Sequence, residues 1–169
     1  MSCPECGFSY EALAPEAVPG RLRSLRSRFS EELAGAGAAA ARRPQPEIWS
    51  ALEYACHVRD VLLVQRERVI AAQVEDMPHP PRMHRDERVA LARYDAHPVP
   101  VVLDQLGMAA ELSAVAFEAL DQAGWARRLI YSWPGVTERD LAWLGRHTVH
   151  EGEHHLMDVR RVLAAVAGS

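Results

Sequence analysis

The chain has 169 residues, of which 49% are hydrophobic and 25% charged, and its formal net charge is −4. This length suits one domain with a buried core, and the balance of charge gives no reason to expect a nucleic acid or an anionic membrane as partner. All 19 basic side chains are Arg, which excludes Schiff-base and Lys-nucleophile chemistry. The N-terminal residues lack the apolar region of a signal peptide, and no run approaches about 18 uninterrupted apolar residues, so we expect a cytoplasmic protein.

The first half of the sequence predicts a lead-in followed by two long helices. Residues 1–18 form the lead-in, which contains a Cys-x-x-Cys motif, and residues 19–169 form the helical domain. The first helix starts near Pro19, because Pro is favoured in the first turn, and reaches the Ala- and Gly-rich stretch 35–41. The second helix spans about 47–75, with neither Pro nor Gly inside it, and such a composition favours helix over sheet.

The second half predicts a crossover and two further helices. Five prolines fall within residues 77–100, so this segment is expected to cross between helices, with a short helix at 86–93. A third helix is expected at 99–123. A fourth follows Thr137, its expected N-cap, and ends near Ala167. The pattern predicts an all-α fold, a four-helix bundle with a long crossover between helices 2 and 3.

The fourth predicted helix carries most of the chemistry. Half of the eight His residues lie within positions 147–155. At about 100° per residue, one stripe roughly 80° wide forms the inward face of this helix. The stripe consists of Leu141, Leu144, Thr148, Glu151, His155, Val159, Val162 and Val166. Glu151 and His155 therefore lie at the centre of the predicted buried face, one turn apart.

A buried carboxylate and imidazole need compensation, because burying an unpaired charge is costly. A shared divalent metal would provide it for Glu151 and His155, and such donors suit Zn²⁺, Ni²⁺, Fe²⁺ or Mn²⁺. His57, in an apolar stretch of the second helix, is the candidate third ligand, since bundles build metal sites from facing helices. The alternatives are an ordinary core His57 and a Glu151–His155 pair without metal. His150 and His154 form a second i, i+4 pair, which points roughly 80–120° away from the stripe.

Cys3-x-x-Cys6-Gly has the form of one zinc knuckle, half of a zinc ribbon. No second Cys-x-x-Cys motif follows. A second zinc site would therefore need two further ligands, for which His147, His150 and His154 are the candidates. A redox dithiol and a segment without function are the alternatives.

Five further side chains near these candidates have two interpretations each. Cys56 fits a buried apolar filler better than a ligand. Asp60 and Asp158 either orient the His rings as hydrogen-bond acceptors or pair with neighbouring Arg residues. Arg127 and Arg128 form either a solvated charge pair or a carboxylate-binding pair at the mouth of the site.

Two spaced motifs resemble those of the DinB-like superfamily, and the resemblance extends over residues 19–167. The motifs are Trp49-x₃-Glu53-x₃-His57-x₂-Asp60 and His150-Glu151-x₂-His154-His155-Leu-x-Asp158-Val. The superfamily includes the mycothiol-dependent maleylpyruvate isomerases and the mycothiol and bacillithiol S-transferases. The resemblance implies a four-helix bundle whose metal, usually zinc or nickel, is held by a His of helix 2 and a (His/Glu)-x₃-His pair of helix 4.

When the ligand positions of the family are matched to this sequence one by one, the resemblance implies His57 as the metal ligand of helix 2. In helix 4 the family pattern continues after its last ligand as Leu-x-(Gln/Asp)-(Ile/Val), which only the residues after His155 match. The implied pair is therefore Glu151 and His155. The alternative pair, His150 and His154, fits the family's commoner all-His set but loses the trailing residues and the core-facing stripe.

The resemblance and an open three-ligand site together favour an enzyme, a metal-dependent S-transferase. Such a metal would deprotonate a low-molecular-weight thiol for attack on a small electrophile. A non-catalytic metal-binding or stress-response protein and a purely structural bundle are the alternatives. The expected partners are a small-molecule thiol and an electrophile, and a homodimer is the expected assembly.

Overall fold

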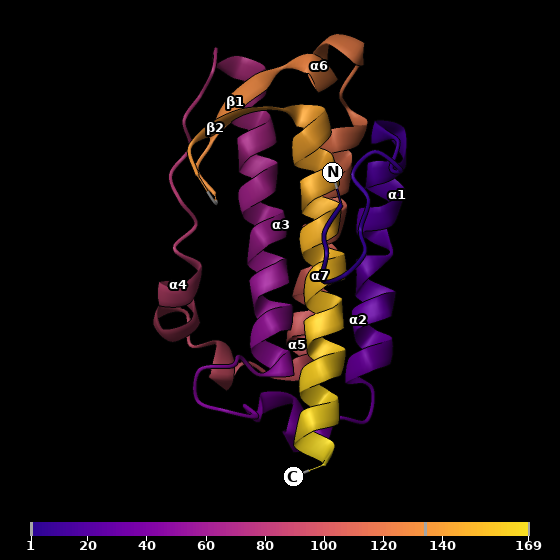
Figure 1. The fold of residues 1–169 in the computed structure, drawn as a ribbon, viewed down its shortest axis with the longest axis vertical. Helices are drawn as coiled ribbons and strands as arrows, with labels where there is room; N and C mark the ends of the chain where they lie inside the picture. The colour runs from indigo at the N-terminus through magenta and orange to yellow at the C-terminus, as the bar shows by residue number, and fades with distance from the viewer. Residues whose placement is uncertain (1, 134, 169) are drawn as a thin grey trace.

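The computed structural model describes residues 2–133 and 135–168 and shows a four-helix bundle (Figure 1). The helices are α1 (Val18–Arg23), α2 (Leu25–Leu33), α3 (Ala51–Val74), α4 (Arg85–Leu91), α5 (Val99–Glu118), α6 (Gln122–Ala126) and α7 (Leu141–Ala167), the strands are β1 (Arg128–Tyr131) and β2 (Thr137–Asp140), and short 3₁₀ turns lie at Pro15–Ala17, Gly37–Ala41 and Tyr94–Ala96. The bundle consists of α3, α5, α7 and the consecutive pair α1 and α2. The predicted all-α fold is confirmed, with one small hairpin added to it.

The predicted crossover lies between α3 and α5. These two helices run in the same direction in Figure 1, so the chain must return along the outside of the bundle to connect them. The returning segment carries α4 and leads to the fully buried Tyr94, whose hydroxyl donates to Oδ2 of Asp60 over 2.7 Å. Tyr94 thereby anchors the crossover to α3, the helix that carries His57.

The start of α3 is fixed by a capping box. The hydroxyl of Ser50 accepts from the backbone N–H of Glu53, and the Glu53 carboxylate accepts from the backbone N–H of Ser50. Arg43, from the preceding loop, donates to both carboxylate oxygens over 2.6 and 2.8 Å. Glu53 of the Trp49-x₃-Glu53-x₃-His57 motif therefore determines where α3 begins, and with it the position of His57 one turn later.

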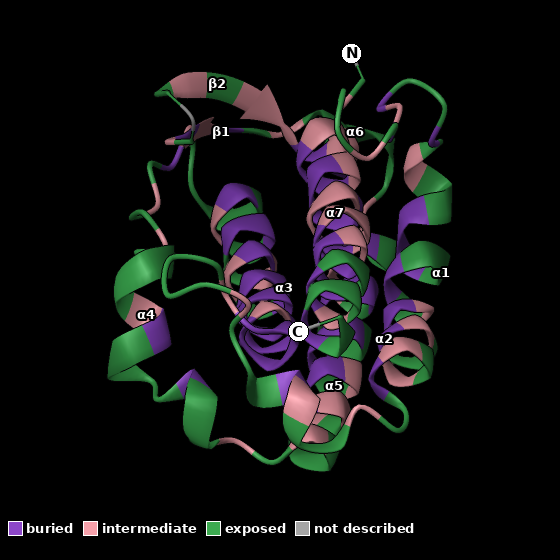
Figure 2. Ribbon diagram, turned by 60° about the horizontal axis from the view of Figure 1, so that its bottom comes forward, coloured by how far each residue is buried: buried purple, intermediate pink, exposed green. Residues whose placement is uncertain are grey.

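A close approach brings α7 against α2. A Cβ atom at Gly152 would lie 2.7 Å from Cδ1 and 2.8 Å from Cδ2 of Leu25, which is fully buried. Seven residues earlier, a Cβ at Gly145 would lie 3.3 Å from both Val18 and Phe117. Because they lack a Cβ, these glycines allow the α7 backbone to lie close to α1 and α2. The buried residues of α3 and α7 lie on the sides of these helices that face the bundle interior (Figure 2).

The third bundle helix, α5, is shorter than predicted. It ends at Glu118, and a separate helix, α6, begins after Asp121, whose side chain accepts from the N–H of Gly124 over 2.7 Å. Among the described residues, α5 is the one helix long and apolar enough to cross a membrane by length and composition, with a mean hydropathy of 1.3. In this structure α5 packs against α3, α1 and α2 as a member of the bundle.

The predicted N-cap of the fourth bundle helix is wrong. Thr137 pairs with Tyr131 in an antiparallel hairpin of β1 and β2, so it lies in a strand. The N-cap of α7 is Asp140, whose carboxylate accepts from the N–H of Trp143 over 2.7 Å. A carboxylate at this position also compensates the positive end of the helix dipole.

Candidate metal centre

Three ligand candidates from two helices converge between α3 and α7. The ligand atoms of His57, Glu151 and His155 all lie within 4.8 Å of one another. Nε2 of His57 is 4.0 Å and Nε2 of His155 is 3.7 Å from Oε2 of Glu151. Two aromatic rings enclose the imidazoles, with Trp49 5.2 Å from His57 and Tyr54 5.3 Å from His155 between centroids. The structure thus brings together the three residues that the sequence singled out.

The donor set fits a divalent cation. Nδ1 of His57 is buried without a hydrogen-bond partner among the described residues, and its Nε2 has only the long contact to Glu151. Nδ1 of His155 is instead 3.0 Å from Oδ2 of Asp158, which leaves Nε2 facing Glu151. An acceptor on one ring nitrogen orients the other toward a metal. Two imidazoles and one carboxylate suit the first-row divalent ions.

Two of the three groups are near pH 7 in the protonation state that a metal requires, and the third is not. Burial, together with the positive charge of His155, lowers the pKa of His57 to about 3, so this ring is neutral near pH 7. Burial disfavours the charge of Glu151, but His155 and His147 overcome it and hold the pKa of this carboxyl well below its usual range. Burial also opposes the charge of His155, while Asp158 and Glu151 raise its pKa to about 9. A metal that binds here must therefore displace a proton from His155.

The three candidates border a cavity of about 770 Å³. Four arginines of its wall lie over aromatic rings that also line it, namely Arg68 over Tyr131, Arg82 and Arg85 over Trp133, and Arg139 over Trp143. Seven members of the predicted α7 stripe are buried, Leu141, Leu144, Thr148, His155, Val159, Val162 and Val166. Glu151 is the partly exposed member, since it faces this open space. A cation held by the three candidates would therefore have coordination positions open to the cavity.

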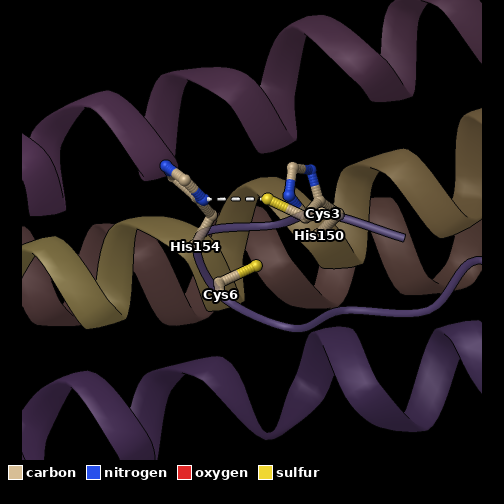
Figure 3. Close-up of side chains that lie close together, drawn as sticks. All are labelled: Cys3, Cys6, His150 and His154. Atoms are coloured by element: carbon tan, nitrogen blue, oxygen red, sulfur yellow. Dashed lines mark hydrogen bonds between the residues drawn. The ribbon is translucent and has the colours of Figure 1, made fainter.

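A second cluster lies on the neighbouring face of α7. Cys3 and Cys6 approach His150 and His154 from the lead-in, and the four ligand atoms all lie within 4.8 Å of one another (Figure 3). The i, i+4 pair that was the alternative for the first site therefore faces two thiols. Cys56 is not part of it, because this side chain is fully buried against the crossover, and burial raises the pKa of its thiol to about 12.

The two aspartates of the family motifs have different surroundings. Asp158 both accepts from His155 and lies 3.6 Å from Arg161, so the two interpretations offered by the sequence hold together. Asp60 accepts from Arg59 over 2.7 Å and from the crossover tyrosine, which gives it a structural role on α3.

The interpretation of Arg127 and Arg128 as a pair at the mouth of the site is wrong. Arg127 donates to the backbone carbonyls of Ala72 and Glu75 over 2.6 Å each, and so caps the C-terminal end of α3. Arg128 pairs with Glu138 across the hairpin. Neither belongs to the described residues that line the cavity.

Two residues of the site were not found by sequence reasoning. The hydroxyl of Tyr10 is 2.9 Å from Nδ1 of His147 and 3.2 Å from Nδ1 of His150, so the lead-in bonds to the His-rich face of α7. The second residue is Arg139, which lines the cavity. Its Nε is buried and has no hydrogen-bond partner among the described residues. An aromatic residue shortly after the Cys-x-x-Cys motif was the available signal for Tyr10, whereas nothing in the sequence marks Arg139.

Comparison with known proteins identifies the family. Residues 16–159 match the sequence model of the DinB superfamily. This match covers most of the chain, so the chain belongs to the DinB superfamily, as its motifs indicated. A similar solved structure is that of YfiT from Bacillus subtilis, described as a probable metal-dependent hydrolase with an unusual four-helix bundle topology; its TM-score is 0.78 at 12% identity, over 88% of this chain and 85% of that chain. No curated protein matches the chain significantly.

Proposed function

We propose that His57, Glu151 and His155 bind one divalent metal ion and that the protein is a metal-dependent S-transferase. The observation that carries the proposal is the convergence of these three ligands, within 4.8 Å, beside a cavity of about 770 Å³. Three protein ligands leave a position for a small molecule, as in catalytic rather than structural zinc sites. Zinc fits the donor set, as do nickel, iron and manganese.

A metal bound here would lower the pKa of a coordinating low-molecular-weight thiol and supply a thiolate near neutral pH. The residues of the chain would bind and orient the two co-substrates. Nε of Arg139 is buried beside the cavity without a partner among the described residues, and its guanidinium lies 4.7 Å from the Trp143 ring. A carboxylate on either co-substrate would satisfy this donor. In the transfer itself, the thiol gives up its proton to solvent and its sulfur forms a bond to the electrophilic carbon. The bond from that carbon to the leaving group breaks, and the leaving group departs with the electron pair, as chloride does from monochlorobimane.

Two alternatives use the same ligands. The description of YfiT as a probable metal-dependent hydrolase suggests attack by a metal-activated water in place of a thiol. A non-catalytic metal-binding protein would hold the ion without turning over a substrate. The product distinguishes the three, because S-transfer yields a thioether, hydrolysis yields an acid or alcohol, and simple binding yields neither. A cytoplasmic location fits the proposal, since reduced thiols are available there.

The test is an assay of purified, metal-analysed protein with monochlorobimane and a panel of low-molecular-weight thiols, read as fluorescent thioether. We expect conjugation above the uncatalysed rate, with loss of this activity in His57→Ala and after chelation. His97→Ala is the matched control, because His97 lies on the crossover and does not line the cavity. Hydrolysis of ester or amide substrates without any thiol would replace the transferase proposal by the hydrolase. If the metal-loaded protein shows neither activity, the result would favour the non-catalytic metal-binding protein over both enzymes.

A further inference from the structure

The N-terminal segment folds as a tight loop that carries two thiols. The backbone N–H of Cys3 donates to the carbonyl of Phe8, and the N–H of Gly7 donates to the carbonyl of Cys3, over 2.9 Å in both cases. Gly7 has a φ of +74°, a left-handed conformation that favours glycine. Figure 3 shows the sulfurs of Cys3 and Cys6 directed into the space beside α7.

Two imidazoles of α7 complete the arrangement. His150 and His154 are one turn apart on the same face of the helix, and Nδ1 of His154 lies 3.7 Å from Sγ of Cys3. All four ligand atoms, two sulfurs and two nitrogens, lie within 4.8 Å of one another. In a tetrahedral zinc site, bond lengths of about 2.0–2.3 Å place ligand atoms about 3.3–3.8 Å apart. A contraction of at most about 1.5 Å between any two ligand atoms would therefore close the shell.

The His150 ring is oriented as a metal ligand would be. Its Nδ1 is 3.2 Å from the hydroxyl of Tyr10, whereas its Nε2 is buried with no hydrogen-bond partner among the described residues. A buried polar atom without a partner is costly, and a metal on Nε2 would remove that cost. The hydroxyl on the opposite nitrogen then fixes the tautomer. His154 has a similar arrangement, with Nε2 3.7 Å from Oδ2 of Asp158 on the side away from Cys3.

We propose that Cys3, Cys6, His150 and His154 form a second metal site, a closed Cys₂His₂ zinc centre. Two thiolates and two imidazoles in a four-ligand shell are the donor set of structural zinc. The proposal is independent of the proposed function, because none of the four residues belongs to the set His57, Glu151 and His155 on which that function rests. It also goes beyond the sequence, which left the partners of the two cysteines open.

The zinc centre would hold the lead-in in place as one wall of the cavity. Cys3, Glu5 and Tyr10 of the lead-in line the same cavity as the first site. Apart from zinc, the contacts of the lead-in with α7 include the hydroxyl of Tyr10 on His147, Glu5 at 3.9 Å from His154, and a backbone carbonyl that accepts from Arg146 over 2.8 Å. The second ion is therefore structural in role, and it shapes the space in which the first site operates.

The test compares zinc content and cobalt spectra of the full chain, purified through a cleavable C-terminal Strep tag so that no tag lies next to Cys3. We expect zinc to fall by about one equivalent per chain in Cys3→Ser and in Cys6→Ser, as a four-ligand site loses a ligand. Cys56→Ser, which alters the third cysteine, is the matched control and keeps full zinc. Cobalt-loaded wild type should show a thiolate-to-cobalt charge-transfer band in the near ultraviolet.

The cobalt band separates this site from the first one, whose ligands contain no sulfur. It should persist in His57→Ala and disappear in Cys3→Ser. Cys6→His, which keeps a ligand in place, should retain zinc and show a weaker band, and circular dichroism checks that every variant is folded. Absence of the band in folded, cobalt-loaded wild type would overturn the proposal. So would unchanged zinc in Cys3→Ser, or a mass lower by two hydrogens that shows a Cys3–Cys6 disulfide in protein purified without oxygen.

Discussion

Nδ1 of His155 lies 3.0 Å from Oδ2 of Asp158, one turn further along α7. This contact fixes the rotation of the ring and leaves its Nε2 facing Glu151 at 3.7 Å. The same carboxylate oxygen is 3.7 Å from Nε2 of His154. Asp158 therefore contacts one ligand candidate of each cluster and positions imidazoles on both faces of the helix.

Replacement of Asp158 by Ala should weaken zinc binding at the first site about 10- to 100-fold, the usual effect of removing the acceptor behind a His ligand. Competition with a zinc-binding dye measures the affinity. Asp104→Ala is the control, because Asp104 is an exposed carboxylate on α5 that pairs with Arg26, away from both clusters. An unchanged affinity in the Asp158 variant would show that the contact to His155 is incidental.

The two i, i+4 pairs of α7 should respond separately to substitution. Glu151→Gln removes the carboxylate that offsets the charge of the metal ion at the first site. The zinc affinity of this site should therefore fall by more than about 100-fold, the upper end of the effect of losing a residue that only supports a ligand. His150→Gln should leave this affinity nearly unchanged and remove the thiolate–cobalt band instead. Isothermal titration of metal-free protein with zinc, combined with cobalt spectra, gives both quantities. The reverse pattern would mean that the first site consists of His57, His150 and His154.

The metal-free protein should lose stability in mild acid partly through His147. Burial lowers the pKa of His147 to about 4, against the attraction of Glu151 3.6 Å away. As the pH falls, His147 is protonated near pH 6.5 in the unfolded chain but only near pH 4 in the folded chain. The contribution of neutral His147 to the free energy of unfolding is therefore present above pH 6.5 and is lost as the pH falls toward 4. The loss from this group is up to about 3 kcal/mol. Urea unfolding at pH 7 and pH 4.5 should show a smaller loss for His147→Gln than for wild type, by about 2 kcal/mol; equal losses would contradict the assignment.

The contact between α7 and α2 should not tolerate a methyl group. Gly152→Ala places a Cβ 2.7 Å from the fully buried Leu25, so the helices must separate or the leucine must leave its position. We expect a net destabilisation of about 1–2 kcal/mol, because overpacking costs more than the gain in helix propensity. Gly20→Ala, where nothing lies within 4 Å of the added Cβ, is the matched control and should be neutral or stabilising. Thermal and urea melting of both variants measure the effect, and a stabilised Gly152→Ala would show that the contact is loose.

The long helices and the crossover could be predicted because their signals are local. Apolar periodicity defines the inward stripe of α7, and prolines stop regular structure between α3 and α5. The hairpin could not be predicted from the sequence, because β2 has the sequence Thr-Glu-Arg-Asp, in which apolar and polar residues do not alternate. Its pairing depends on contacts made only in the folded chain, such as the N–H of Ile130 donating to the carbonyl of Pro78 over 2.9 Å.

In the candidate sites too, the residues related by local spacing could be predicted, and those brought together by tertiary contacts could not. The i, i+4 spacing placed Glu151 and His155 together, and a helix-bundle argument added His57 from α3. The partners of Cys3 and Cys6 could not be selected, because the choice depends on how the lead-in docks against α7. The contact of Tyr10 with His147 and His150, which guides that docking, is a tertiary one.

Both ligand sets join an early part of the chain to its last helix. Cys3 and His154 are 151 residues apart, and His57 likewise meets its partners only on α7. During synthesis the lead-in and α3 leave the ribosome well before α7 exists, and contacts of such long range form last. A translation product that stops before His150 would contain both thiols and His57 but neither of the helical pairs that complete the proposed sites. Retention of metal would thus be acquired only after α7 has been synthesised, so chains that stop before it would remain without metal.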